Sequence, residues 1–281
     1  MNDRKVSPHA VMRTVQMSSS HEVSMPMSLA ERIDGHLSDG NVYGQSGAKV
    51  YRLSRGIDQD ELYLKYGDGL IADEITGEMA RLIWLSKHAP VPNVVHFTRV
   101  NSHAWLLTSA LQGVTAMEAI QSLPSSAESI VEQIAQFIRT LHAIPTDACP
   151  FQRPLSAVLR QARQRIDAGL VDVDDFDQER AGCSEEDVWQ ELGRALPVDA
   201  DPVVVHGDFS LENIIVYEGR VIGCVDVGRL GVADRYQDVA ITWNGLREFS
   251  PELSERFLSL YGAEHADRRK IDFYLLLDEL F

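Results

Sequence analysis

Residues 203–228 read VVVHGDFSLENIIVYEGRVIGCVDVG, and this stretch decides the fold. Its runs of β-branched residues, interrupted by a polar segment and by the Glu218-Gly219 turn, predict a strand, a loop and then a β-hairpin. Three side chains that can bind through oxygen lie on this unit: Asp208, Asn213 and Asp226. The sequence therefore predicts a site built from two carboxylates and one amide on these loops.

The spacing within this stretch is typical of phosphoryl transfer. Asp208 and Asn213 fit the catalytic-loop pattern H-R-D-x-x-x-x-N, with Gly207 in place of the arginine, and residues 226–228 (DVG) take the place of D-F-G. This chemistry needs a carboxylate beside the acceptor hydroxyl and oxygen ligands for the Mg²⁺ that bridges the phosphates. We therefore predict Asp208 as the catalytic base and Asn213 and Asp226 as the metal ligands. Either motif alone is more often a turn, and only the combination indicates the chemistry.

A lysine and a glutamate earlier in the chain complete the pattern. Lys65 lies on a predicted strand over residues 61–66, and Glu78 lies on a predicted helix over residues 74–87. This arrangement fits a strand lysine that contacts the nucleotide phosphates while it is paired with a helix glutamate. Lys65 alone would more often be a surface lysine.

Two further residues are candidates for nucleotide binding. Tyr63 shares a strand face with Lys65 and is placed to stack on adenine, with packing in the core as the alternative. Ser46, with the backbone amides of its turn, is a candidate phosphate contact. The glycines of this turn, at positions 40, 44 and 47, do not fit G-x-G-x-x-G.

The periodicity of the chain predicts an α+β protein with two lobes. Residues 1–28 show no clear period and are expected to form a flexible tail. Residues 29–110 are rich in predicted strands and form the nucleotide-binding N-lobe, and residues 111–281 are mainly helical and form the C-lobe. Within the C-lobe, residues 125–128 (SSAE) predict a capping box, and the acidic residues 172–179 predict a solvated loop.

The chain is strongly acidic, with 26 lysines and arginines against 42 aspartates and glutamates in 281 residues, which gives a formal charge of −16. This charge disfavours partners such as nucleic acid and anionic membranes and attracts a cationic small molecule, although solubility alone is an alternative reason for it. Three cysteines without framework spacing favour reduced thiols and a cytoplasmic protein. No stretch has the length of a membrane span. Both a monomer and a dimer remain open.

From residue 40 to residue 281 the chain resembles the aminoglycoside phosphotransferases, and most closely the aminoglycoside 3'-phosphotransferases that confer kanamycin and neomycin resistance. The resemblance rests on the segments 48–52 (AKVYR), 62–65 (LYLK), 141–142 (LH), 149–151 (CPF), 206–213, 225–238 and 277–281 (LDELF). It implies a two-lobed protein-kinase-like fold with ATP, or alternatively GTP, and Mg²⁺ as cofactors between the lobes.

The resemblance also implies an antibiotic-binding site in the second lobe. It places these residues around the aminoglycoside: Asp175, Asp177, Glu179, Arg229, Glu248, Asp278, Glu279 and Phe281 with its carboxylate. Gln178 stands where a relative has an acid, and His206 is expected to support the loop rather than to transfer a proton. Carboxylates suit a substrate that carries several ammonium groups.

The sequence thus predicts transfer of the γ-phosphoryl group to the 3'-hydroxyl of a deoxystreptamine aminoglycoside. One alternative is a kinase of another small hydroxylated acceptor, such as streptomycin. The other is a nucleotide-binding regulatory protein without catalysis, which is disfavoured because Lys65, Glu78, Asp208, Asn213 and Asp226 are all present.

Overall fold

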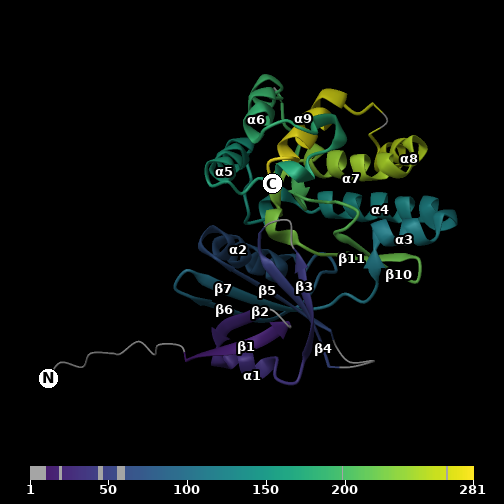
Figure 1. Cartoon of the computed structure of the whole chain (residues 1–281). Coiled ribbons are helices and arrows are strands. Elements are labelled where there is room, and N and C mark those ends of the chain that lie inside the picture. Colours follow the sequence, from purple (N-terminus) through teal and green to yellow (C-terminus); the bar gives the residue numbers. More distant parts are fainter. Residues whose placement is uncertain (1–10, 19–20, 44–46, 56–60, 198, 264) are drawn as a thin grey trace. The chain divides into compact units, whose positions relative to one another are not determined.

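The structure, a computed structural model, describes residues 11–18, 21–43, 47–55, 61–197, 199–263 and 265–281 (Figure 1). Its contacts divide the chain into two compact units, one of residues 1–80 and 92–110 and the other of residues 81–91 and 111–281. Residues 81–91 therefore belong with the second unit, whereas the sequence had assigned them to the N-lobe. Arg81 shows why, because its Nε donates a hydrogen bond to the carbonyl oxygen of Leu230 at 2.7 Å.

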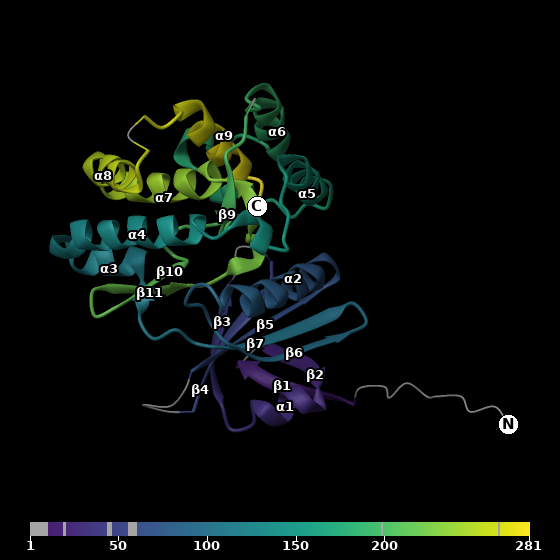
Figure 2. The same cartoon turned by 180° about the vertical axis from the view of Figure 1, so that it is seen from behind.

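The first unit is built on a five-stranded antiparallel sheet with the strand order β3-β4-β5-β7-β6 (Figure 2). Its strands are β3 (Leu37–Tyr43), β4 (Lys49–Ser54), β5 (Leu62–Asp68), β6 (Val94–Val100) and β7 (His103–Ser109). Helix α2 (Gly69–Leu85) follows β5 directly. The two approach closely at Gly67, where a Cβ atom would lie 2.3 Å from Ile71 Cγ2. Glycine at this position lets the helix lie against the strand.

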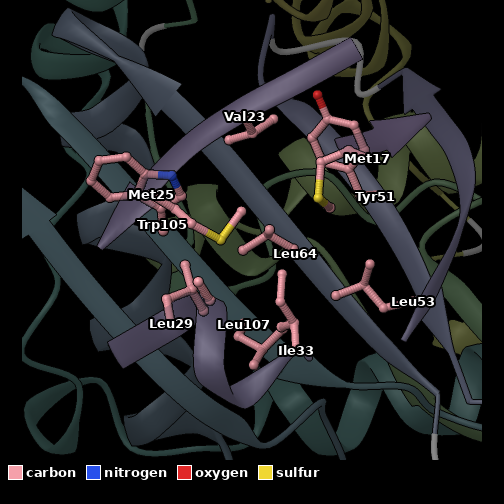
Figure 3. Close-up of a cluster of buried hydrophobic side chains, with 11 residues drawn as sticks. Met17, Val23, Met25, Leu29, Ile33, Tyr51, Leu53, Leu64, Trp105 and Leu107 are labelled. Carbon is pink, nitrogen blue, oxygen red and sulfur yellow. The ribbon is translucent and has the colours of Figure 1, made fainter. Parts of the chain in front are cut away.

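The opposite face of the sheet is covered by the N-terminal segment, which the sequence had assigned to a flexible tail. That prediction is wrong for the described residues from 12 onward. Strands β1 (Met12–Ser18) and β2 (His21–Pro26) form an antiparallel hairpin, and helix α1 (Met27–Arg32) follows. Met17, Val23 and Met25, which are 2%, 4% and 0% exposed, pack with residues of the sheet such as Trp105 and Leu64 (Figure 3).

The second unit is mainly helical. Its helices are α3 (Ala116–Ser122), α4 (Ala127–His142), α5 (Leu155–Asp167), α6 (Glu185–Arg194), α7 (Tyr236–Phe249), α8 (Pro251–Tyr261) and α9 (Arg268–Asp278). Helices α4, α7 and α8 lie side by side (Figures 1 and 2). The predicted loop 172–179 contains two short 3₁₀ turns, Val173–Asp175 and Gln178–Arg180.

Short strands in this unit carry the catalytic-loop motif. Strands β8 (Val114–Thr115), β10 (Ile214–Tyr217) and β11 (Arg220–Cys224) form one sheet in the order β11-β10-β8. Strands β9 (Pro202–Val205) and β12 (Gly231–Asp234) pair antiparallel in another. The predicted strand, loop and hairpin are therefore present, and residues 206–213 connect the two small sheets.

The predicted capping box at residues 125–128 does not form. Pro124–Ser126 makes a 3₁₀ turn before α4, and the hydroxyl of Ser126 donates to the carbonyl oxygen of Leu123 at 2.8 Å instead of capping the helix. Capping boxes occur instead at the starts of α3, on Thr115, and of α6, on Ser184.

Candidate active site

In the first unit, β5 and α2 bring the predicted lysine and glutamate together. Lys65 Nζ lies 2.8 Å from Glu78 Oε2, and the two side chains are only 14% and 10% exposed. Leu64 points to the opposite face of β5 and is fully buried in the core that the N-terminal hairpin covers. The alternation of β5 thus separates a hydrophobic face from a face that presents Lys65 and Tyr63. Ser46 lies outside the described residues.

In the second unit, the loop after β9 carries Asp208. Gly207 precedes it with φ of +90°, and a Cβ atom at this position would lie 2.2 Å from the carbonyl oxygen of Arg229. Only glycine combines this backbone conformation with so close an approach. This contact explains why the chain has Gly207 where the catalytic-loop pattern has arginine.

Side chains of helix α7 form hydrogen bonds with the backbone of the same loop. The fully buried carboxylate of Asp238 accepts hydrogen bonds from the backbone N–H groups of His206 and Gly207, both at 2.7 Å. Gln237 Nε2 donates to the carbonyl oxygen of Gly207 at 2.8 Å, and Thr242 Oγ1 donates to that of Phe209 at 2.7 Å. These contacts fix the backbone on both sides of Asp208.

No role was predicted for these residues of α7. A signal was available, because Gln237, Asp238 and Thr242 directly flank the apolar residues 239–241, and a buried polar side chain requires a partner. The partner itself cannot be named without the tertiary contact.

The predicted metal ligands lie at one end of the β10–β11 hairpin. Asn213 Nδ2 donates to the carbonyl oxygen of Asp208 at 3.0 Å, and the N–H of Val225 donates to the carbonyl oxygen of Asn213 at 2.9 Å. Asp226 follows with a left-handed backbone, φ 54° and ψ 57°, a costly conformation for a residue other than glycine. His206 Nε2 lies 2.9 Å from the carbonyl oxygen of Val225, so His206 has the supporting role that was predicted for it.

A cluster of carboxylates surrounds the catalytic loop at the end of α9. Arg229 Nη1 lies 3.2 Å from Asp278 Oδ1 and 3.8 Å from Asp208 Oδ2. The guanidinium of Arg229 also lies over the ring of Phe281, 4.9 Å from its centre. Burial, and next the charge of Asp208, raise the pKa of Asp278 to about 7, while Arg229 opposes this shift.

The acidic loop joins this cluster through Glu279. The backbone N–H of Asp177 donates to the Glu279 carboxylate at 3.2 Å, and Arg180 Nη1 lies 3.3 Å from Glu279 Oε1. Asn244 Nδ2 donates to Asp177 Oδ2 at 3.1 Å. Burial, and next the charge of Asp177, raise the pKa of Glu279. We call Asp177, Asp208, Asp278 and Glu279 the carboxylate cluster.

The remaining predicted acidic substrate residues are exposed side chains outside this cluster. Glu179 is exposed and lies 3.4 Å from Arg247 Nη2, and Asp175 is exposed in its 3₁₀ turn. Glu248 is exposed on α7, and no hydrogen bond or ion pair among the described residues joins it to the carboxylate cluster. Arg165, for which no role was predicted, donates from Nη2 to the main-chain oxygen of Phe281 at 2.8 Å.

Known proteins are similar in sequence to this protein over most of its length. Residues 43–274 match the model of the phosphotransferase enzyme family. An aminoglycoside 3'-phosphotransferase of Escherichia coli is 50% identical over 238 residues, which cover 85% of this chain and 88% of that protein. A second one from Escherichia coli is 48% identical over 258 residues, 92% of this chain and 95% of that protein.

The chain belongs to the aminoglycoside phosphotransferase family.

Solved structures of aminoglycoside phosphotransferases agree with this assignment. The crystal structure of an aminoglycoside 3'-phosphotransferase of type VIII has a TM-score of 0.79 and 35% identity, and covers 90% of this chain and 97% of its own. An aminoglycoside phosphotransferase from Streptomyces rimosus, in complex with ADP and streptomycin, has a TM-score of 0.73 and 32% identity, and covers 84% of this chain and 93% of its own.

Membership in the aminoglycoside phosphotransferase family confirms two predictions: the α+β, protein-kinase-like fold class and the phosphotransferase enzyme class. It also supports the use of a nucleotide, because the family neighbour from Streptomyces rimosus was solved with ADP. Within the described ranges, no helix combines the length and the hydropathy that are needed to cross a bilayer.

Proposed function

We propose that this chain transfers the γ-phosphoryl group of ATP to the 3'-hydroxyl of a kanamycin- or neomycin-type aminoglycoside. The observation that carries the proposal is the position of Asp208, which lies beside Arg229 and Asp278 on a loop whose backbone is hydrogen-bonded to α7. A carboxylate in this position serves two purposes at once. It accepts the proton of the attacking hydroxyl, and it adds to the negative charge that attracts a polycationic substrate.

The donor set of the second unit fits Mg²⁺, which prefers hard oxygen ligands. Asn213 uses its Nδ2 in the hydrogen bond to Asp208, so its Oδ1 is the atom left for a metal, and Asp226 supplies a carboxylate. A bound Mg²⁺ would neutralise charge that develops on the phosphate oxygens. We assign the remaining coordination positions to phosphate oxygens and water.

The first unit supplies the contacts to the nucleotide. Lys65, oriented by its ion pair with Glu78, contacts the phosphates of ATP. Tyr63, on the same strand face, stacks on the base, and Ser46 contacts phosphate. Phosphate contacts alone do not distinguish ATP from GTP. Both nucleotides are therefore to be compared as phosphoryl donors, with ATP tested first.

The carboxylate cluster supplies the contacts to the antibiotic. Ammonium groups of the drug pair with Asp278 and Glu279, and with the acids of the loop that carries Asp175, Asp177 and Glu179. Burial and neighbouring carboxylates raise the pKa values of Asp278 and Glu279, which disfavours their negative charges in the free protein. Binding of a cation relieves that cost. Phosphorylation adds negative charge to a drug that binds ribosomal RNA through positive charge, and this is how resistance would arise.

The test is ADP release with Mg²⁺ and ATP in the presence of kanamycin, of lividomycin A, which lacks the 3'-hydroxyl, and of streptomycin. We expect turnover with kanamycin only, and a product whose ³¹P–¹H correlations place the phosphate at the 3'-oxygen. The variant Asp208→Asn should lower kcat by about 10²–10⁴-fold. Near-normal turnover in that variant would exclude Asp208 as the base.

A second acceptor is streptomycin, since the structural neighbour from Streptomyces rimosus was solved with ADP and streptomycin at 32% identity. Turnover with streptomycin but not with kanamycin would retain the kinase and reject our assignment of the antibiotic.

A further inference from the structure

One chain of hydrogen bonds leads from the surface of the second unit to the backbone of the catalytic loop. His142, at the end of α4, is buried between α7 and α8, with Nε2 3.0 Å from Asp238 Oδ2 and Nδ1 2.8 Å from the hydroxyl oxygen of Tyr261. Arg235 Nη1 donates to that same hydroxyl oxygen at 3.2 Å, and Arg235 Nη2 donates to Asp201 Oδ1 at 3.1 Å. Tyr261 and Arg235 line the same surface pocket of about 540 Å³.

The carboxylate of Asp238 sets the assignment of protons in this chain for a neutral His142. A carboxylate can only accept, so Nε2 of His142 carries the hydrogen, Nδ1 is then an acceptor, and the hydroxyl of Tyr261 donates to it while its oxygen accepts from Arg235. Burial raises the pKa of Tyr261 to about 12, so its hydroxyl hydrogen is present at neutral pH. His142 must then accept at Nδ1 and carry its proton at Nε2, where it donates to Asp238.

The other tautomer of His142 would be unfavourable at Asp238, where its Nε2 lone pair would face a carboxylate oxygen. The hydroxyl of Tyr261 adds to this preference, because it can donate to Nδ1 only in the tautomer that carries its hydrogen on Nε2. In a buried environment such mismatched contacts cost more than in water.

We propose that Tyr261, oriented by Arg235, is a positioning residue for phosphoryl transfer, because it fixes the proton of His142 on Nε2 and thereby keeps Asp238 aligned on the backbone of the catalytic loop. This proposal rests on the proposed function, since its kinetic consequence is measured as phosphoryl transfer. Its structural consequence, the tautomer of His142, can be measured without activity.

Removal of the hydroxyl leaves Nδ1 of His142 without its donor. The ring then has one partner in place of two, so both its orientation and its tautomer become less well defined, and the hydrogen bond to Asp238 weakens. A displaced Asp238 carboxylate then also displaces the N–H groups of His206 and Gly207, which precede Asp208 and donate to this carboxylate. We expect Tyr261→Phe to lower kcat about 5- to 20-fold, the range that corresponds to one buried hydrogen bond. The KM for the antibiotic should change by less than about twofold, because none of the carboxylate cluster is altered.

The matched control is Tyr274→Phe, which removes the hydroxyl of another buried tyrosine on α9, outside this chain of hydrogen bonds. A second background separates positioning from packing. In His142→Gln the amide N–H can donate to Asp238 and has no tautomer, so the addition of Tyr261→Phe to this variant should change kcat by less than about twofold.

The spectroscopic readout is the two-bond ¹H–¹⁵N correlation spectrum of the histidine rings, which distinguishes the two neutral tautomers. The chain has nine histidines, and the signals of His142 are those that disappear in His142→Gln. We expect a single Nε2–H tautomer in the wild type and in Tyr274→Phe, and an altered or averaged pattern in Tyr261→Phe.

Three results would overturn the proposal: an unchanged His142 spectrum in Tyr261→Phe, an equal loss of kcat in Tyr274→Phe, or an equal loss when Tyr261→Phe is added to His142→Gln. If the wild type itself fails to phosphorylate any aminoglycoside, the proposed function fails, whereas the spectra still decide the role of Tyr261.

Discussion

Replacement of Gly207 by alanine tests how closely the catalytic loop must approach the segment that carries Arg229. The added Cβ atom would lie 2.2 Å from the carbonyl oxygen of Arg229, a separation that must grow to at least 3.0 Å. The backbone at Gly207 has φ of +90°, which costs alanine about 1–2 kcal/mol. Relief of the overlap adds about 1–3 kcal/mol. We expect Gly207→Ala to lower the free energy of unfolding by about 2–5 kcal/mol.

Gly182 offers a matched control in the same unit, because its φ is +87° and a Cβ atom there would meet no atom within 4 Å. Gly182→Ala therefore carries the conformational cost without the overlap, and should destabilise by about 1–2 kcal/mol. The displacement in Gly207→Ala is close to 1 Å and lies next to Asp208, so kcat should fall about 100-fold, while Gly182→Ala keeps its activity.

Urea denaturation and the rate of ADP release measure the two effects in both variants. If Gly207→Ala matches Gly182→Ala in both stability and kcat, the close approach does not position the loop and the reasoning is refuted. A loss of stability with normal kcat would show that the overlap is relieved away from Asp208.

The other predictions concern three separate contacts. Lys65→Met should lower kcat/KM for ATP about 10²–10³-fold, because a preorganised phosphate contact is lost, and steady-state kinetics with varied ATP check this; an unchanged KM and kcat would exclude Lys65 from the nucleotide site. Asp278 has a pKa raised to about 7, so it is protonated below that pH and ionised above it, and kcat/KM for kanamycin should rise from pH 6 to pH 8. Asp278→Asn should flatten this rise, and the ratio of the two profiles cancels the titration of the drug itself; parallel profiles would contradict the assignment. Met25→Ala, at a fully buried position, should destabilise by about 2–5 kcal/mol, whereas Met27→Ala, at a side chain that is 40% exposed, should have little effect on urea denaturation; equal effects would contradict the packed N-terminal hairpin.

Much of the candidate site could be predicted because its residues are close in sequence or follow one element's period. The spacing from Asp208 to Asn213 is a property of a single loop, and the shared face of Tyr63 and Lys65 follows from the alternation of one strand. Lys65 and Glu78 lie on consecutive elements, so their ion pair at 2.8 Å could also be expected from the chain.

The N-terminal hairpin could not be predicted in the same way. Apolar residues do alternate on both strands, with Val15 and Met17 on one and Val23 and Met25 on the other. The pattern is weak, because the strands are short and the segment between them is rich in serine. A two-stranded hairpin is only marginally stable by itself. It forms here because one face of the sheet, with Trp105 and Leu64, would be exposed without it, and the apolar side chains of the hairpin are buried against this face.

By itself the sequence predicted the enzyme class of this protein, since the identity and local spacing of Asp208, Asn213 and Asp226 are typical of a phosphoryl-transfer site. Only the tertiary structure decided what holds that site in place. Asp238 reaches the loop from 31 residues away in the chain, His142 reaches Asp238 from a second helix, and Tyr261 reaches His142 from a third. The physical reason is that local spacing sets the conformation of a single segment. The hydrogen-bond donors of a buried carboxylate, in contrast, come from any segment that helix packing brings within hydrogen-bond distance.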